Sequence, residues 1–151
     1  AEQGDENAFT LPHPTVQGSP FDFSFSGLKT AVINLIHNAS QKGEQLPVAD
    51  LSASFRKAVV DCLLKNVILA MNDTNYKKLV IAGGVSANSL LRRRLQQECK
   101  EKGWEIHMPA LNLCGDNAAM VGAQAYYEFL AGKIAGMDLN ACAAMPIDNN
   151  F

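Results

Sequence analysis

The sequence predicts an α/β fold that is rich in helices and has few strands. Three observations support this prediction: long segments with apolar residues at helical spacing, two short segments typical of strands, and a glycine pair between the first strand and the next helix. The predicted order is helix, helix, strand, helix, strand, helix. Because two short strands make a poor sheet, we expect either that further chain completes the sheet or that this piece packs in an unusual way.

Composition favours one folded domain. The chain has 151 residues and a mass of 16.3 kDa, with 48% hydrophobic and 19% charged residues, which is enough apolar material for a packed core. The net charge of −2 argues against a protein that coats nucleic acid, although it leaves a local basic face possible. No apolar run approaches the roughly 18–20 residues of a membrane span, so we expect no membrane contact.

The cysteines and histidines indicate a reducing compartment and no zinc-protease motif. No two of the four cysteines form a C-x-x-C pair, no two histidines share a helix face, and H-E-x-x-H is absent. The first seven residues are acidic and polar, which is not typical of a signal peptide. We therefore expect a cytoplasmic protein with reduced thiols. Residue 1 is Ala rather than Met, so the chain fits either a processed protein or a piece of a longer one.

The first half of the chain is predicted to be mostly helical. Residues 1–20 are polar and contain three prolines, which indicates an irregular lead-in. Residues 21–25 alternate apolar and polar and suggest a short extended piece. A first helix is predicted over 28–39. A second, from about 47 to 71, has a wide apolar face that predicts a central, well-buried position.

The second half begins with a predicted strand and helix. Residues 79–82 form a short continuous apolar run, which indicates a strand buried on both faces. A helix is predicted over 89–102, and Gly103 provides its stop.

The last third contains a second strand and a final helix. Residues 104–108 alternate and predict the strand, which Pro109 ends. A loop over 112–116 leads into a helix over 117–130 that is rich in small residues. The tail, 132–151, has little periodicity, and we expect it to be weakly structured.

The strand–glycine–helix unit is the first candidate site. Gly83 and Gly84 allow a ligand to approach the backbone closely, the helix beyond them offers free N–H groups, and Asn88 could hydrogen-bond a ribose or a base. The alternative is a tight turn in which Asn88 or Ser86 caps the helix.

Asp116 is the second candidate, at the start of the last helix. The simplest interpretation is an N-cap, and the alternative is a carboxylate that binds a metal or lies near a phosphate. Small residues keep the following helix slim, so another backbone could approach it.

Two further features have ordinary explanations. The aromatic cluster in residues 21–30 favours hydrophobic packing. The run Arg92–Arg94 favours a solvated helix face, with contact to RNA phosphates as the alternative.

Four blocks taken together resemble the TsaD family, in that family's order and spacing. The resemblance extends from residue 1 to about residue 132. The blocks are F-D-F-S-F-S-G-L-K-T, A-D-L-S-A-S-F-R-K-A-V-V-D, L-V-I-A-G-G-V-S-A-N-S-L-L-R and C-G-D-N-A-A-M. The family was formerly described as O-sialoglycoprotein endopeptidases and is now understood as the tRNA threonylcarbamoyladenosine transferase. The chain is most similar to the C-terminal portion of the bacterial type.

The resemblance implies a fold and an activity. The family has the actin-like ASKHA fold, with two related α/β lobes around a cleft. It transfers the threonylcarbamoyl group from threonylcarbamoyl-AMP to the adenosine beside the anticodon of tRNAs that read codons beginning with A. Its partners include tRNA and the TsaB and TsaE proteins.

The resemblance also implies site residues. Asn88, with Gly83 and Gly84 beside it, matches the asparagine that contacts the nucleotide, which is threonylcarbamoyl-AMP or an ATP-like ligand. Asp116 matches a ligand of one divalent metal ion, iron or zinc, which two histidines of an H-x-x-x-H helix in the first lobe also bind.

Two departures limit what the chain itself is expected to do. Gly115 stands where threonine is usual in the family, and the H-x-x-x-H pair is absent. One carboxylate is too few ligands for a metal site, and no residue is a convincing general base, so no catalytic residue is assigned. We therefore expect a single fragment, inactive alone, of an acyltransferase. The alternatives are a non-catalytic fragment that dimerises, and a metallo-endopeptidase.

Overall fold

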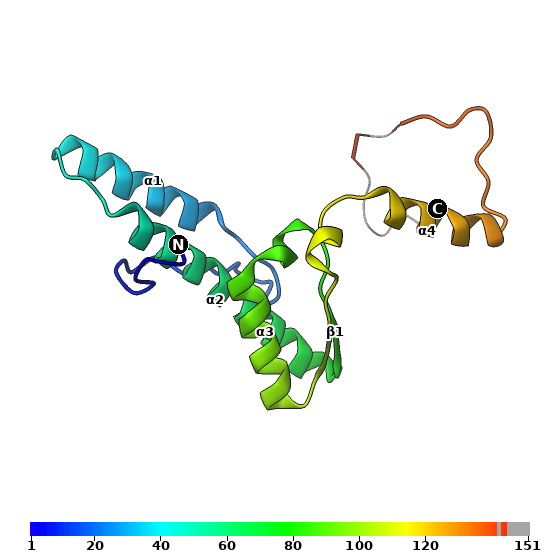
Figure 1. The fold of residues 1–151 in the computed structure, drawn as a ribbon, viewed down its shortest axis with the longest axis horizontal. Coiled ribbons are helices and arrows are strands. Elements are labelled where there is room, and N and C mark those ends of the chain that lie inside the picture. The colour runs from blue at the N-terminus through cyan, green and yellow to red at the C-terminus, as the bar shows by residue number, and fades with distance from the viewer. Residues whose placement is uncertain (142, 145–151) are drawn as a thin grey trace.

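The computed structural model describes residues 1–141 and 143–144 and has a helix-rich α/β architecture, which confirms that part of the prediction (Figure 1). Residue 142 and residues 145–151 of the predicted tail lie outside the described residues. The elements in chain order are α1 (Ser26–Gln41), α2 (Val48–Thr74), β1 (Lys78–Val80), the 3-10 turn η1 (Gly84–Ala87), α3 (Ser89–Lys102), β2 (Glu105–His107), the 3-10 turn η2 (Leu111–Leu113) and α4 (Ala118–Leu130).

Helix α2 occupies the centre of the packed region, as its wide apolar face predicts. It begins after Pro47, whose fixed φ suits a helix start, and it ends at Thr74, followed by the C-cap Asn75 with a left-handed φ of 56°. One side of α2 packs against α1 and the lead-in. The buried residues of this cluster are Leu11, Leu28 and Ala58.

The opposite side of α2 packs against α3 and one face of the sheet. Parallel strands β1 and β2 pair with Leu79 opposite Ile106, and both side chains contact the core between α2 and α3. This position explains why the apolar periodicity of α3 is so regular. The buried residues of the main cluster are Val60, Leu64, Leu90, Leu91 and Leu95.

The strand after α2 is not buried on both faces, so that prediction is wrong. Val80 is 72% exposed, while Leu79 on the opposite face is partly buried. The physical reason is that α2 and α3 cover only one face of a sheet of two strands, and no other element in the described part of the chain covers the second face. The apolar run at residues 79–82 is typical of a strand that is covered on both faces, whereas the described residues cover only one face of this strand.

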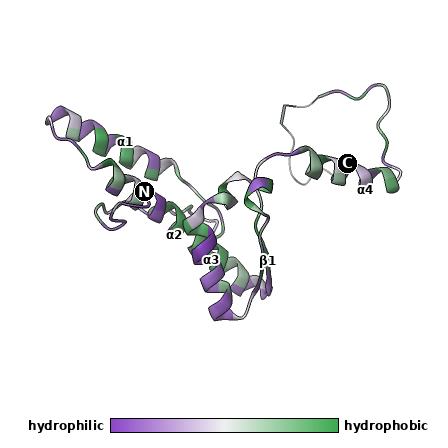
Figure 2. Ribbon diagram, viewed as in Figure 1, coloured by the Kyte–Doolittle hydropathy of each residue, from purple (hydrophilic) through white to green (hydrophobic). Residues whose placement is uncertain are grey.

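The two C-terminal helices differ in their surroundings. Helix α3 has the predicted bounds and is followed by the C-cap Gly103, which has a φ of 67°. Helix α4 has no buried residue and stands apart from the other helices (Figure 1). Apolar residues nevertheless lie along it (Figure 2).

Residues 1–25 contain no helix or strand, yet the lead-in is attached to α2. The backbone N–H of Asp5 donates to Asp50 Oδ1 at 2.9 Å, and that of Phe9 donates to Ser54 Oγ at 3.1 Å. The aromatic residues that follow are not core residues. Phe23 and Phe25 stack on each other with ring centroids 6.3 Å apart and remain partly exposed. Within the described residues, no helix is both long and apolar enough to cross a membrane.

Candidate functional site

A hollow of about 660 Å³ lies where the carboxyl ends of β1 and β2 meet, between the two loops that leave the strands. In parallel sheets, ligands bind beyond the carboxyl ends of the strands, because the loops there diverge and leave a crevice. Gly83 comes from the loop after β1 and Asp116 from the loop after β2, and both line this hollow. Gly84 and Asn88 are not among its lining residues, so the structure brings together two of the four predicted site residues.

The glycine loop has an open, glycine-dependent backbone. Gly83 has a φ of 85° and a ψ of 166°, a conformation that L side chains rarely adopt. Apart from the neighbouring residues in sequence, no atom of the described residues lies within 4 Å of where a Cβ would stand on Gly83 or Gly84. Side chains of the described residues therefore leave the space beside this backbone open.

Asn88 is the N-cap of α3, which confirms the simpler of the two interpretations. Its Oδ1 accepts hydrogen bonds from the backbone N–H groups of Leu90 at 3.0 Å and Leu91 at 3.1 Å. The N–H groups expected to be free for a ligand are thus partly occupied by the cap itself. The Asn88 amide nitrogen donates to no group among the described residues, so it keeps its capacity to donate to a ligand.

Asp116 is exposed and does not cap α4, which corrects the N-cap interpretation. Asn117 is the cap instead: its backbone is extended just before the helix, and its Oδ1 accepts from the N–H of Met120 at 3.0 Å. The cap position falls one residue later than predicted, which leaves the Asp116 carboxylate at the wall of the hollow. Gly115 beside it has open space around its Cα.

The described residues do not form a metal centre by themselves. No three His, Cys, Asp or Glu side chains among them are grouped so that they could bind one ion. His107 and Cys114 also line the hollow, but His107 Nε2 lies 2.9 Å from Glu105 Oε1, and the Cys114 thiol donates to Ala110 O at 3.5 Å. Asp116 would therefore contribute one ligand, which is fewer than a protein metal site needs.

The arginine run is not simply a solvated face. Arg92 donates to Ser86 O at 3.0 Å and to Pro109 O at 2.9 Å, and Arg94 pairs with Asp61 at 3.2 Å. Of these three arginines, only Arg93 is exposed, and the other two are half-buried. Sequence reasoning missed these contacts because the partners lie 6, 17 and 33 residues away in the chain.

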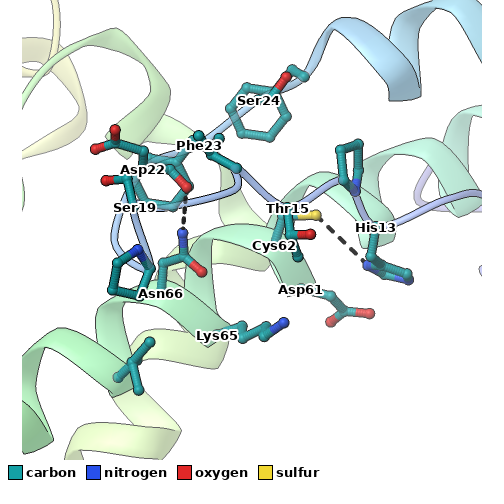
Figure 3. A pocket seen from close by; sticks show the side chains of 15 residues that line it. His13, Thr15, Ser19, Asp22, Phe23, Ser24, Asp61, Cys62, Lys65 and Asn66 are labelled. Carbon is teal, nitrogen blue, oxygen red and sulfur yellow. Dashed lines mark hydrogen bonds between the residues drawn. The ribbon is translucent and has the colours of Figure 1, made fainter.

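A second hollow, of about 470 Å³, lies between the lead-in and α2 (Figure 3). Cys62 Sγ lies 3.6 Å from His13 Nδ1, and Asn66 Nδ2 donates to Asp22 O at 2.8 Å. The sequence gives no signal for the Cys62–His13 pair, because 49 residues separate its members.

The electrostatics of this second hollow disfavour nucleophilic chemistry. Burial raises the pKa of the Cys62 thiol, and the neighbouring Asp61 carboxylate raises it further. A reactive cysteine needs a lowered pKa, because the thiolate is the nucleophile. The Cys62–His13 contact therefore joins the lead-in to α2 and does not activate the thiol.

One family model matches most of the chain. The model is described as TsaD, tRNA N6-adenosine threonylcarbamoyltransferase, and it matches residues 1–123.

Curated proteins with that same name are similar to the chain. The protein of Clostridium botulinum (strain Kyoto / Type A2) is 44% identical over 141 residues, which is 93% of this chain and 42% of the relative. The protein of Limosilactobacillus reuteri (strain DSM 20016) is 45% identical over 145 residues, with 95% and 42% covered. The chain thus spans about two fifths of the length of the curated relatives it matches.

Proposed function

The chain belongs to the TsaD family, and from that premise we propose that it forms one part of an enzyme that transfers the threonylcarbamoyl group to adenosine in tRNA. The observation that carries the proposal is the match over residues 1–123, together with the shared name of relatives more than 40% identical. Because the chain spans 42% of these relatives, the complete activity belongs to a longer polypeptide.

The proposal includes the architecture of the complete enzyme. A two-lobed, actin-like ASKHA fold would place this chain in the C-terminal lobe, with the cleft beside the ends of β1 and β2. Two features support this placement. No element among the described residues covers the second face of the β1–β2 sheet, and the hollow lies at the carboxyl ends of the strands, where α/β proteins bind ligands.

The segment around Asn88 is proposed to bind the nucleotide part of threonylcarbamoyl-AMP. Its free amide nitrogen can donate to a ribose or base acceptor while its Oδ1 holds the start of α3. The open backbone at Gly83 and Gly84 lets a ligand approach without meeting a side chain. These residues would orient the donor, and orientation of reactants contributes much of the rate in group transfer.

Asp116 is proposed as one ligand of an iron or zinc ion. Its carboxylate is exposed at the hollow, which supports access for an ion. The remaining ligands would have to come from outside the described residues, since these offer no group of three. We assign no reaction step to the ion and no catalytic acid or base to this chain.

The direct test is a chimera. In the Clostridium botulinum relative, this chain replaces the segment it matches, and the purified chimera is supplied with tRNA, threonylcarbamoyl-AMP and the TsaB and TsaE partners. We expect threonylcarbamoyladenosine in the tRNA, measured by mass spectrometry of its nucleosides. A folded, monodisperse chimera that modifies no tRNA would refute the proposal.

Two substitutions in the chimera test the residue roles. Asn88→Ser keeps an N-cap oxygen but removes the amide donor, so we expect normal folding with a raised KM for threonylcarbamoyl-AMP. Asp116→Ala should lower the metal content, measured by atomic emission, whereas Asp73→Ala at the exposed end of α2 should not. Unchanged metal content in Asp116→Ala would remove the ligand assignment.

A further inference from the structure

We propose that Arg92 is a positioning residue that holds the Asn88 segment and the Asp116 segment in a fixed relation across the hollow. For clarity, the first segment is residues 83–88 and the second is residues 108–116. The role of Arg92 in group transfer rests on the proposed function. The structural role, in which Arg92 joins the two segments by hydrogen bonds and which we call the structural tie, does not.

The guanidinium group of Arg92 contacts both segments. Its Nη1 donates to Ser86 O at 3.0 Å, within the first segment, and its Nη2 donates to Pro109 O at 2.9 Å, within the second. Nη1 also lies 3.7 Å from Cys114 Sγ, two residues before Asp116. One side chain therefore spans the two loops that carry the proposed site.

No other hydrogen bond joins these segments among the described residues. The last bond of the strand pairing runs from Ile81 N to His107 O at 3.0 Å, just before both loops begin. Beyond that point the loop bonds stay local, such as Ser86 N to Gly83 O and Leu113 N to Ala110 O. Among the described residues, Arg92 therefore supplies the side-chain hydrogen bonds that join the two loops beyond the paired strands.

Arg92 is itself fixed by the helix that carries Asn88. Its backbone N–H donates to Asn88 O at 3.0 Å, so the two residues lie one turn apart on α3. That turn is anchored in the core by Leu90 and Leu91, which are 2% and 5% exposed. A displacement of Asn88 relative to the second segment would therefore break contacts of Arg92.

The chemistry of arginine suits this role. Its planar fork can donate to two carbonyl groups in different segments at once, whereas lysine offers a single ammonium group on a flexible stem. Hydrogen bonds from a charged donor are also stronger than neutral ones. Arg93, the next residue on α3, is exposed and makes no such contact with the described residues, so it provides a matched control.

The first test measures how well Cys114 is protected in the chain of 151 residues. Cys114 is 4% exposed beside Arg92, so release of the second segment should expose its thiol. After iodoacetamide treatment, alkylation of each cysteine is followed by peptide mass spectrometry. We expect Arg92→Met to speed alkylation of Cys114 by about tenfold, with Cys62 and Cys99 unchanged. Arg93→Met should match the parent chain, and Arg92→Lys should fall between.

Two outcomes of this test would overturn the structural tie. One is an unchanged Cys114 rate in Arg92→Met. The other is an equal rise at Cys62, Cys99 and Cys114, which would mean that Arg92 supports the whole fold rather than the two segments. If Arg92→Met does not fold, Arg92→Lys, which keeps the positive charge and the aliphatic stem, is used in its place. The structural tie then requires that the alkylation rate rises at Cys114 and not at Cys62 or Cys99.

The second test measures transfer in the chimera. Arg92→Met should lower kcat/KM for threonylcarbamoyl-AMP by about tenfold, and Arg92→Lys should recover part of it. A faster Cys114 reaction with unchanged kcat/KM would overturn the role in transfer while the structural tie stands. An inactive chimera with Arg92 intact would refute the proposed function, and the alkylation result would still decide the tie.

Discussion

Two units of this chain have the same plan but different surroundings. In the first, β1 leads through η1 into α3, and in the second, β2 leads through η2 into α4. Each helix has an asparagine N-cap, Asn88 in the first unit and Asn117 in the second. Yet α3 buries four residues in the core, while α4 buries none.

The comparison shows that local signals and packing are separate requirements. The caps, the helical periodicity and the preceding turn are present in both units, and both helices form. Within the part of the chain that the structure describes, α3 packs against α2, whereas α4 packs against no other helix. In proteins most helix stability comes from packing an apolar face. The first unit should therefore resist perturbation as part of the whole fold, and the second should respond alone.

The largest expected difference concerns leucine truncation. Leu95 on α3 is 3% exposed, so Leu95→Ala should lower the free energy of unfolding by about 2–5 kcal/mol. Leu130 on α4 is 62% exposed, so Leu130→Ala should change it by less than about 0.5 kcal/mol. Urea unfolding followed by tryptophan fluorescence of Trp104 measures both. Equal losses would break the comparison.

Glycine replacement should lower global stability in the first unit and change only local helicity in the second. Gly103 ends α3 with a φ of 67°, so Gly103→Ala should cost about 1–2 kcal/mol of global stability despite the open space around it. Gly122 lies inside α4, and Gly122→Ala should raise the helical circular dichroism signal without moving the unfolding midpoint. A stabilising Gly103→Ala would contradict this account of the α3 end.

Removal of the two N-caps should also affect the units differently, with a smaller difference in the free energy of unfolding than leucine truncation gives. Asn88→Ala should lower the free energy of unfolding by about 1 kcal/mol, because two N–H groups at the start of α3 lose their acceptor. Asn117→Ala should reduce only the helicity of α4. If Asn117→Ala shifts the urea midpoint as far as Asn88→Ala does, α4 is coupled to the core.

The smallest expected effect is a pH dependence within the packed unit. Burial raises the pKa of the Cys99 thiol on α3, and the neighbouring Glu98 raises it further. Because the folded pKa lies above the unfolded one, this contribution is complete below the ordinary thiol pKa and is lost as pH rises through the raised value. The urea midpoint should therefore fall above about pH 9, and less so in Cys99→Ala. An identical fall in both proteins would refute this assignment.

Local features of the fold could be predicted from the sequence. The bounds of α3 follow from its periodicity, its cap and Gly103, all of which are encoded within a few residues. The burial of the first strand could not be predicted, because burial depends on what covers the second face. The apolar run at residues 79–82 predicts a cover, and Val80 remains exposed in this chain.

The candidate site was likewise only partly predictable. The glycine pair and Asp116 each have a local signal, and the structure places Gly83 and Asp116 on one hollow. The side-chain oxygen of Asn88 caps α3, while its amide nitrogen bonds to no described residue. These separate roles could not be predicted without the three-dimensional structure. The contacts of Arg92 join residues far apart in sequence, so an arginine run can only be interpreted as a charged face until the loops are placed.

Residue-resolved hydrogen exchange of the 151-residue chain tests the central contrast between the two units most directly. The account predicts that amides of α3 exchange only with global unfolding, whereas those of α4 exchange almost as fast as in an unfolded chain. Comparable protection of α3 and α4 would contradict it, because α4 would then share the stability of the core.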